Sequence, residues 1–225
     1  MATSFLDFQK TEDGSLTIFS KQFQETYHSR HGAITESLHV YINQGLIYKM
    51  RQKDGPLKVG EMGLGTGMNA FLTMQAADKE KRSVFYSSIE AFPLQKAEIN
   101  RLKTEAWVGE NGIYEKMINA ADGQKLDLSP YFQFECHHRF WPQTNPFQNL
   151  DLLFYDAFAP GSQPELWDEV AMKNAWDSLL PGGVLVTYCA KSYVKRILKQ
   201  LGFTIERLKG PPGKLEMTRA TKPEY

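Results

Sequence analysis

The chain has 225 residues, 42% hydrophobic and 23% charged, which suits one folded domain of ordinary size and excludes two large ones. Its 26 basic and 26 acidic residues cancel, so the composition as a whole favours neither nucleic acid nor an acidic ligand. The two cysteines, Cys136 and Cys189, are too few for a disulfide framework or a cysteine-rich zinc site.

Residues 1–56 are predicted to form a small N-terminal extension with strands. Apolar residues alternate with polar ones at 16–19 and 38–42, which predicts two short strands. Several polar or aromatic side chains near and between them suit either the wall of a substrate pocket or an exposed loop: Tyr27, His28, His31 and Glu36. We therefore expect this extension to shape the substrate side of a domain that spans residues 57–225.

From residue 57 onward the pattern alternates between strands and helices, which predicts a parallel sheet covered by helices on both faces, a Rossmann-like α/β fold. The predicted strands are Leu57–Met62, Val84–Glu90, Tyr131–Cys136, Asp151–Tyr155 and Val184–Cys189. The predicted helices are Met68–Ala77, Pro93–Leu102, Tyr114–Ala120, Pro164–Leu180 and Tyr193–Leu201. The chain is predicted to finish in an antiparallel hairpin, Phe203–Leu208 and Leu215–Ala220, around the turn Lys209–Lys214.

Three glycines, Gly63, Gly65 and Gly67, lie between the first predicted strand of this domain and its first helix. Glycines in that position allow a tight turn and let the backbone approach a ligand closely. The GxGxG spacing with Glu61 two residues ahead is more typical of S-adenosylmethionine sites than of dinucleotide sites, because a carboxylate can pair with an ammonium group but repels a pyrophosphate. A merely structural strand-to-helix turn is the alternative.

Two further acids are predicted to lie at the carboxyl ends of strands, where open α/β sheets bind their ligands. Glu90 follows Gly67 by 23 residues, close to the offset at which an acid reaches ribose hydroxyls. Asp156 ends a continuous apolar strand and precedes Ala-Phe-Ala-Pro, which makes it the candidate catalytic residue. A solvated strand-end acid and a loop cap are the respective alternatives.

The adjacent His137 and His138 are candidates for metal ligands, but they project differently and no carboxylate cluster accompanies them. We therefore expect no metal. His137 is instead a candidate for a place beside the adenine ring, with ordinary packing as the alternative.

The C-terminal part of the chain is basic. Residues 186–225 contain nine basic and three acidic residues, so this tail carries a net charge of plus six, and a polyanionic partner is one interpretation. A solvated basic helix and hairpin is the other. Residues 1–14 contain no apolar leader, and no stretch approaches about 18 consecutive apolar residues, so we expect a cytoplasmic protein with no membrane partner.

Several segments together resemble the methyltransferase part of the MnmC-type enzymes, which complete 5-methylaminomethyl-2-thiouridine at the tRNA wobble position. The resemblance spans nearly the whole chain and rests on residues 19–29 (FSKQFQETYHS), 61–71 (EMGLGTGMNAF), 88–94 (SIEAFPL), 151–160 (DLLFYDAFAP), 164–167 (PELW), 179–188 (LLPGGVLVTY) and 208–220 (LKGPPGKLEMTRA). It implies that Glu61, Gly63 and Gly65 contact S-adenosylmethionine, that Glu90 holds its ribose, and that Asp156 lies where methyl donor and amine meet.

The predicted reaction is N-methylation of 5-aminomethyl-2-thiouridine, with S-adenosylhomocysteine as the second product. We expect Asp156 to accept a hydrogen bond from the neutral amine and to help remove its proton, with Tyr27, Glu36 and Phe158 at the substrate. Lys209 and Lys214 are the candidates for holding phosphates of the tRNA anticodon stem-loop. The resembling family also has a form fused to a flavin-dependent oxidase; we expect no flavin in this chain, and separate upstream enzymes that make the aminomethyl-uridine.

Two alternatives stay open at the level of sequence. A methyltransferase or aminopropyltransferase for a small amine would share the fold and an aspartate near this position. A non-catalytic Rossmann-like subunit that binds RNA with its basic tail is the second. An NAD-dependent oxidoreductase is disfavoured by the glycine spacing.

Overall fold

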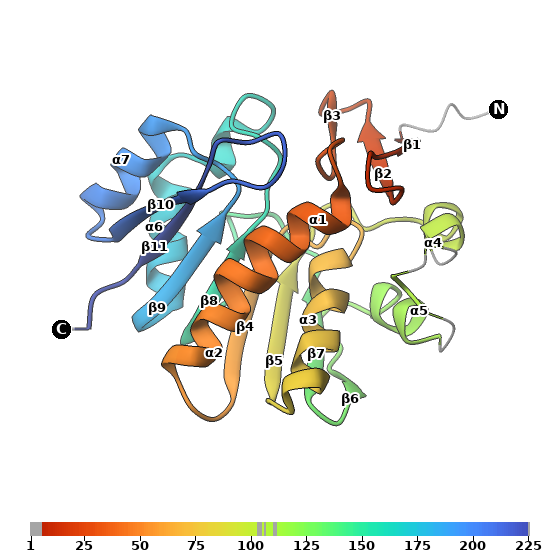
Figure 1. Cartoon of the computed structure of the whole chain (residues 1–225), viewed down its shortest axis with the longest axis horizontal. Helices are drawn as coiled ribbons and strands as arrows, with labels where there is room; N and C mark the ends of the chain where they lie inside the picture. Colours follow the sequence, from red (N-terminus) through yellow and green to blue (C-terminus); the bar gives the residue numbers. More distant parts are fainter. Residues whose placement is uncertain (1–5, 103–104, 106, 110–111, 225) are drawn as a thin grey trace.

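An eight-stranded sheet forms the centre of the computed structural model of this chain, which describes residues 6–102, 105, 107–109 and 112–224 (Figure 1). In spatial order its strands are β10 (Thr204–Lys209), β11 (Glu216–Thr221), β9 (Leu179–Thr187), β8 (Leu150–Tyr155), β4 (Leu57–Met62), β5 (Val84–Ile89), β7 (Phe132–His137) and β6 (Leu126–Ser129). The five strands from β9 to β7 run parallel, and β11, β10 and β6 are antiparallel to their neighbours. The parallel sheet and the C-terminal hairpin are thus confirmed.

Helices cover both faces of this sheet, as predicted (Figure 1). One face is covered by α1 (Ala33–Ser37), η1 (Leu38–Ile47), α2 (Tyr48–Gln52), α3 (Met68–Glu80) and α5 (Ile113–Ile118), and α4 (Lys96–Leu102) contributes buried residues to the same apolar cluster. The other packs against η2 (Pro164–Leu166), α6 (Glu169–Ser178) and α7 (Ser192–Gln200). Every residue of β8 is buried, because this central strand lies between two apolar layers.

The strand predicted at residues 38–42 is wrong. The structure has a continuous helix from Ala33 to Gln52 there, with a π-helical centre, η1. Alternation over five residues is too short to decide between strand and helix, and the buried Tyr41 breaks it. The buried residues of η1 lie between the sheet strands β8 and β9 and helix α3: Val40, Tyr41, Ile42, Gly45 and Leu46.

The helix predicted at Pro164–Leu180 is two elements. The short η2 comes first, and α6 begins only after Asp168, whose side chain caps it by accepting a hydrogen bond from the backbone N–H of Ala171 at 2.8 Å. Leu179 and Leu180 already belong to β9. The strands β1, β3 and β6 were not predicted, since β3 has two residues and the others have weak apolar patterns.

A separate three-stranded sheet, β1 (Leu6–Lys10), β2 (Leu16–Ser20) and β3 (Glu25–Thr26), lies beyond the carboxyl ends of the parallel strands (Figure 1). Residues just after β3 contact the glycine loop: His28 Nε2 lies 2.7 Å from Thr66 Oγ1. Glu25 accepts a hydrogen bond at 2.8 Å from the backbone N–H of Ala159, which follows β8. The N-terminal strands therefore form a wall over the end of the sheet, while helices of the same N-terminal region pack on its face. The division at residue 56 stays a prediction.

Within the described part of the chain, no helix is both long and apolar enough to cross a bilayer.

We predict that Gly45→Leu will destabilise the fold. A Cβ at this position would lie 3.0 Å from both Phe154 Cε1 and Val186 Cγ2, so a leucine side chain must push η1 away from the sheet. We expect the free energy of unfolding to fall by about 1–3 kcal/mol in urea denaturation. Asn43→Leu, at an exposed position on the same helix, is the control and should change it little. Equal stability of the two variants would contradict this packing.

Candidate active site

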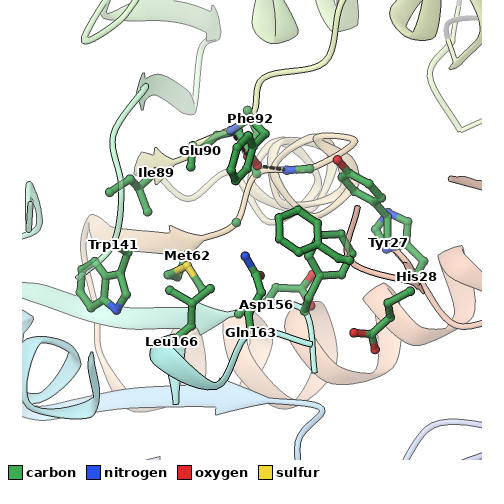
Figure 2. A pocket seen from close by; sticks show the side chains of 18 of the residues that line it. Tyr27, His28, Met62, Ile89, Glu90, Phe92, Trp141, Asp156, Gln163 and Leu166 are labelled. Atoms are coloured by element: carbon green, nitrogen blue, oxygen red, sulfur yellow. Dashed lines mark hydrogen bonds between the residues drawn. The ribbon is translucent and has the colours of Figure 1, made fainter. Parts of the chain in front are cut away.

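A cavity of about 460 Å³ opens at the carboxyl ends of β4, β5 and β8 (Figure 2). Figure 2 shows Met62, Ile89, Trp141 and Leu166 on one side of it, Tyr27 and His28 on the other, and Asp156 between them. The walls come from segments far apart in the sequence, which the parallel topology and the N-terminal sheet bring together. Such an edge is where α/β sheets bind their ligands.

The glycine loop forms one wall of the cavity through backbone atoms. Gly63 has a φ of +89°, and a Cβ there would lie 2.8 Å from the carbonyl oxygen of Asp156. Gly65 has a φ of +53°, and a Cβ there would lie 2.9 Å from Cδ1 of Tyr27. Both positions therefore require glycine, and the backbone at Gly65 runs directly beneath the ring of Tyr27.

Glu90 follows β5 and is held by two backbone donors. Its Oε2 accepts from the N–H of Gly65 and its Oε1 from the N–H of Phe92, both at 2.8 Å. Burial raises the pKa of this carboxyl group, and the backbone donors counter part of that rise. Each carboxylate oxygen has capacity for a further hydrogen bond, so Glu90 can accept two hydroxyl groups of a ligand.

Glu61 is fully buried behind the glycine loop and is not part of the cavity wall. Its Oε1 accepts from Asn69 Nδ2 at 3.0 Å, and its Oε2 lies 3.4 Å from Ser88 Oγ. Burial and the nearby charge of Asp156 raise the pKa of Glu61 well above its ordinary value. Its carboxyl group is thus linked to Asp156 in the cavity through Asn69, whose Nδ2 donates to both.

Asp156, in contrast, lines the cavity at its centre. Tyr41 Oη donates to its Oδ1 at 2.6 Å, and Asn69 Nδ2 donates to its Oδ2 at 2.8 Å. Burial raises the pKa of Asp156 to about 7, although the two hydrogen bonds lower it in part. This carboxyl group can therefore gain or lose a proton near neutral pH, which suits a general base.

The outer part of the cavity combines aromatic rings with an ion pair. Phe158 packs against Tyr27 and Phe23, with ring centroids 5.0 and 4.9 Å away. The Lys214 ammonium group pairs with the buried Glu36 and lies 3.9 Å from the ring centroid of Tyr188. Lys214 therefore belongs to the wall of the cavity.

The structure brings together eight of the twelve predicted site residues in the cavity wall: Tyr27, Glu36, Gly63, Gly65, Glu90, Asp156, Phe158 and Lys214. Glu61, Gly67, His137 and Lys209 lie outside it. His137 ends β7 with its Nε2 3.5 Å from Glu135 Oε1, and Arg139, Phe140 and Trp141 line the cavity in its place. Lys209 is exposed, and its carbonyl oxygen lies 2.8 Å from His39 Nε2.

Tyr41 and Asn69 are the functional candidates that the sequence reasoning missed. Asn69 stands two residues after the last glycine of the loop, so its place in the motif was a usable signal. Tyr41 was missed because residues 38–42 were predicted to be a strand. Only the helix η1, which packs across the sheet, places Tyr41 beside Asp156 at the end of β8.

The arrangement suits a ligand that carries a diol and a positive charge. Glu90 can accept the diol, glycine backbone lies alongside it, and the buried carboxyl groups of Glu61 and Asp156 favour a cation nearby. In the described part of the chain, no three His, Cys, Asp or Glu side chains are grouped so that they could hold a metal ion.

Sequence comparisons with known proteins identify the family. A sequence model of the family described as "S-adenosyl-L-methionine-dependent methyltransferase" matches residues 94–223. The tRNA 5-methylaminomethyl-2-thiouridine biosynthesis bifunctional protein MnmC of Stutzerimonas stutzeri is 26% identical over 219 residues, which is 89% of this chain and 32% of that protein. Its namesake from Acinetobacter baylyi is 27% identical over 98% of this chain and 38% of its own length. The chain thus spans about a third of the length of the relatives it matches.

Solved structures show the same fold. MnmC2 from Aquifex aeolicus superposes with a TM-score of 0.77 at 22% identity, over 100% of this chain and 74% of that one. The spermidine synthase of Thermotoga maritima gives a TM-score of 0.57 at 13% identity, over 98% and 70% of the two chains.

We predict that Asp156→Asn will change the pH dependence of stability. The folded state binds the Asp156 proton more tightly than the unfolded chain does, so ionisation costs the wild type stability as the pH rises from about 4 to about 7. Between about pH 5 and about pH 8 the wild type should lose roughly 1–4 kcal/mol relative to the variant. In the variant the Asp156 charge no longer raises the pKa of Glu61. Ionisation of Glu61 therefore also costs the variant less stability than it costs the wild type as the pH rises.

Urea denaturation at several pH values measures this difference. Asp54→Asn, at an exposed position, is the control, and its curve should run parallel to that of the wild type. A constant offset between wild type and Asp156→Asn at all pH values would mean that the pKa of Asp156 is not raised by folding.

Proposed function

The chain belongs to the S-adenosyl-L-methionine-dependent methyltransferases, and on this premise we propose that it methylates the aminomethyl nitrogen of 5-aminomethyl-2-thiouridine at the wobble position of tRNA. The observation that carries the proposal is the position of Asp156. It lines the cavity together with the glycine loop and Glu90, the aromatic rings of Tyr27 and Phe158, and the Glu36–Lys214 pair. The names of the relatives supply the choice of acceptor.

The residues present fit S-adenosylmethionine. Glu90 would hold its ribose hydroxyls, the backbone of Gly63 and Gly65 would lie along it, and the buried carboxyl groups of Glu61 and Asp156 would stabilise its positive charges. When bound, the cofactor supplies a methyl group on a cationic sulfur: the amine lone pair forms the new N–C bond, and the electrons of the broken S–C bond stay on sulfur in S-adenosylhomocysteine.

On the acceptor side, the task of the protein is to align the amine and keep it unprotonated. An ammonium group has no lone pair, so Asp156 would accept a hydrogen bond from the neutral amine and then take up the proton that the nitrogen loses. A pKa of about 7 suits both steps, because the group is ionised in a large fraction of molecules at neutral pH and still a competent base. Tyr27 and Phe158 would pack against the uracil ring.

Recognition of tRNA would combine these rings with exposed cations. Bases in a single-stranded loop can be splayed out and stacked on aromatic side chains, and Phe92 and Phe140 are also exposed near the cavity. Five basic residues of the tail are exposed and would face phosphates: Lys191, Arg196, Lys199, Arg207 and Lys209. Three other basic residues of the tail form ion pairs: Lys195 with Glu216, Lys214 with Glu36 and Arg219 with Glu206. The expected role of Lys214 at a phosphate is therefore replaced by a role in the cavity wall.

The proposal includes a cytoplasmic location, where tRNA and reduced cysteines are found, and a supply of aminomethyl-uridine by other enzymes. A direct test incubates the purified protein with labelled S-adenosylmethionine and either undermodified tRNA or polyamines. Nucleoside mass spectrometry should find the label in 5-methylaminomethyl-2-thiouridine. Label in polyamines alone would indicate a small-amine transferase, and no binding of S-adenosylmethionine would indicate an RNA-binding subunit.

We predict that Asp156→Asn will abolish transfer while binding of S-adenosylmethionine remains measurable. The amide keeps the shape of the side chain but cannot take up a proton, so kcat should fall by about 100-fold or more. Calorimetry should show binding of the cofactor to the variant. Asp54→Asn serves as the control, and turnover near the wild-type rate in Asp156→Asn would remove this residue from the mechanism.

We further predict that Glu90→Gln will weaken cofactor binding. The substitution replaces one acceptor oxygen by an amide donor, which opposes the N–H of Gly65 or of Phe92 and leaves fewer acceptors for hydroxyls. Calorimetry should show a Kd for S-adenosylmethionine about tenfold higher, a difference of about 1.4 kcal/mol. Glu80→Gln, at the far end of α3, is the matched control. An unchanged Kd would argue against the role of Glu90 at the ribose.

A further inference from the structure

Two buried side chains each hold one oxygen of the Asp156 carboxyl group. Tyr41 Oη donates to Oδ1 at 2.6 Å, and Asn69 Nδ2 donates to Oδ2 at 2.8 Å. Tyr41 comes from η1 and Asn69 from the first turn of α3, two helices that pack on the same face of the sheet. With one donor on each oxygen, the plane of the carboxyl group is fixed before any ligand enters.

Neither donor can easily turn away. Tyr41 is 1% exposed, and its ring packs against Phe154 with centroids 5.2 Å apart. Asn69 is 2% exposed, and its amide nitrogen faces two carboxyl groups, since it also donates to Glu61 at 3.0 Å. The opposite orientation would place its oxygen against both acids.

Among the residues that the structure describes, the buried carbonyl oxygen of Asn69 has no hydrogen-bond partner. A buried unpaired acceptor costs about 1–3 kcal/mol, so an arrangement selected for stability alone would satisfy it. The side-chain amide is instead oriented so that its nitrogen donates to both carboxyl groups.

We propose that Tyr41 and Asn69 are positioning residues for methyl transfer, which aim the free lone pairs of Asp156 at the amine and keep that carboxyl group able to accept its proton. This inference rests on the proposed function and assigns roles to two residues outside the cavity wall.

The electrostatic surroundings explain why such donors are needed. Burial raises the pKa of Asp156 most, Glu36 raises it further, and Lys214 lowers it. The titratable or charged groups that face Asp156 are Tyr41, Glu36, Glu61, Tyr86, Tyr188 and Lys214. Because each of the two hydrogen bonds stabilises the ionised carboxylate, loss of either one would raise the pKa of Asp156 above about 7 and leave it protonated at neutral pH.

The test is Tyr41→Phe, which removes one hydroxyl group and keeps the ring. We expect kcat at neutral pH to fall about tenfold, the acidic limb of the kcat profile to move to higher pH, and the KM for S-adenosylmethionine to stay within about twofold. Tyr48→Phe is the matched control: it lies two turns further along the same continuous helix, and its ring packs under the Arg219 guanidinium group instead.

A second measurement does not depend on turnover. A carbon-13 NMR titration of labelled aspartate carboxyl groups, with Asp156 assigned through Asp156→Asn, should give a higher pKa for Asp156 in Tyr41→Phe than in the wild type and in Tyr48→Phe. Asn69→Ala provides an independent variant if Tyr41→Phe does not fold, and it should raise this pKa as well.

The outcomes separate the two proposals. A wild type that binds S-adenosylmethionine but methylates no tRNA refutes the proposed acceptor, and the NMR titration then still decides whether Tyr41 and Asn69 act on Asp156. An unchanged pKa in the variants, with wild-type kcat and pH profile, would overturn the positioning roles.

Discussion

The burial of two carboxyl groups around a single amide is the constraint on which the site depends. Glu61 and Asp156 share Asn69 Nδ2 as a donor, at 3.0 and 2.8 Å, where Glu61 and Asn69 are buried and Asp156 lines the cavity. Two negative charges at that separation disfavour each other unless one is protonated or a cation is close. An acidic centre of this kind is poorly suited to phosphate and well suited to a sulfonium and an amine, which links the local electrostatics to the chemistry of a methyltransferase.

The N-terminal region turns this acidic edge of the sheet into an enclosed site. Tyr27 packs on Gly65, His28 lies 2.7 Å from Thr66, and Glu36 holds Lys214. Burial lowers the pKa of His28 to about 4, so it stays neutral at the glycine loop and adds no positive charge there. The same region also supplies Tyr41, whose hydroxyl group donates a hydrogen bond to Asp156. The N-terminal region therefore contributes both to the outer wall of the cavity and to the position of Asp156.

Much of the fold followed from local patterns. The glycine loop, β4, β5 and β8 were predictable because each combines a short apolar run with a glycine or acid at its end, and parallel topology then places Glu90 and Asp156 at one edge. Tyr41 and the true place of Lys214 were not predictable, since both depend on tertiary contacts across more than 100 residues. His137 was predicted from its position after a strand, yet the chain continues beyond it before it turns towards the cavity with Arg139.

The order of the last strands has a consequence for biosynthesis. β11, the last strand among the described residues, lies between β9 and β10, and Lys214 just before it belongs to the cavity wall and pairs with Glu36. During translation β10 therefore has no neighbour in the sheet, and β9 keeps an open edge, until residues 216–221 have left the ribosome. A nascent or truncated chain would carry the glycine loop but an unfinished acceptor wall, so the ability to bind the methyl donor would precede the ability to choose what is methylated.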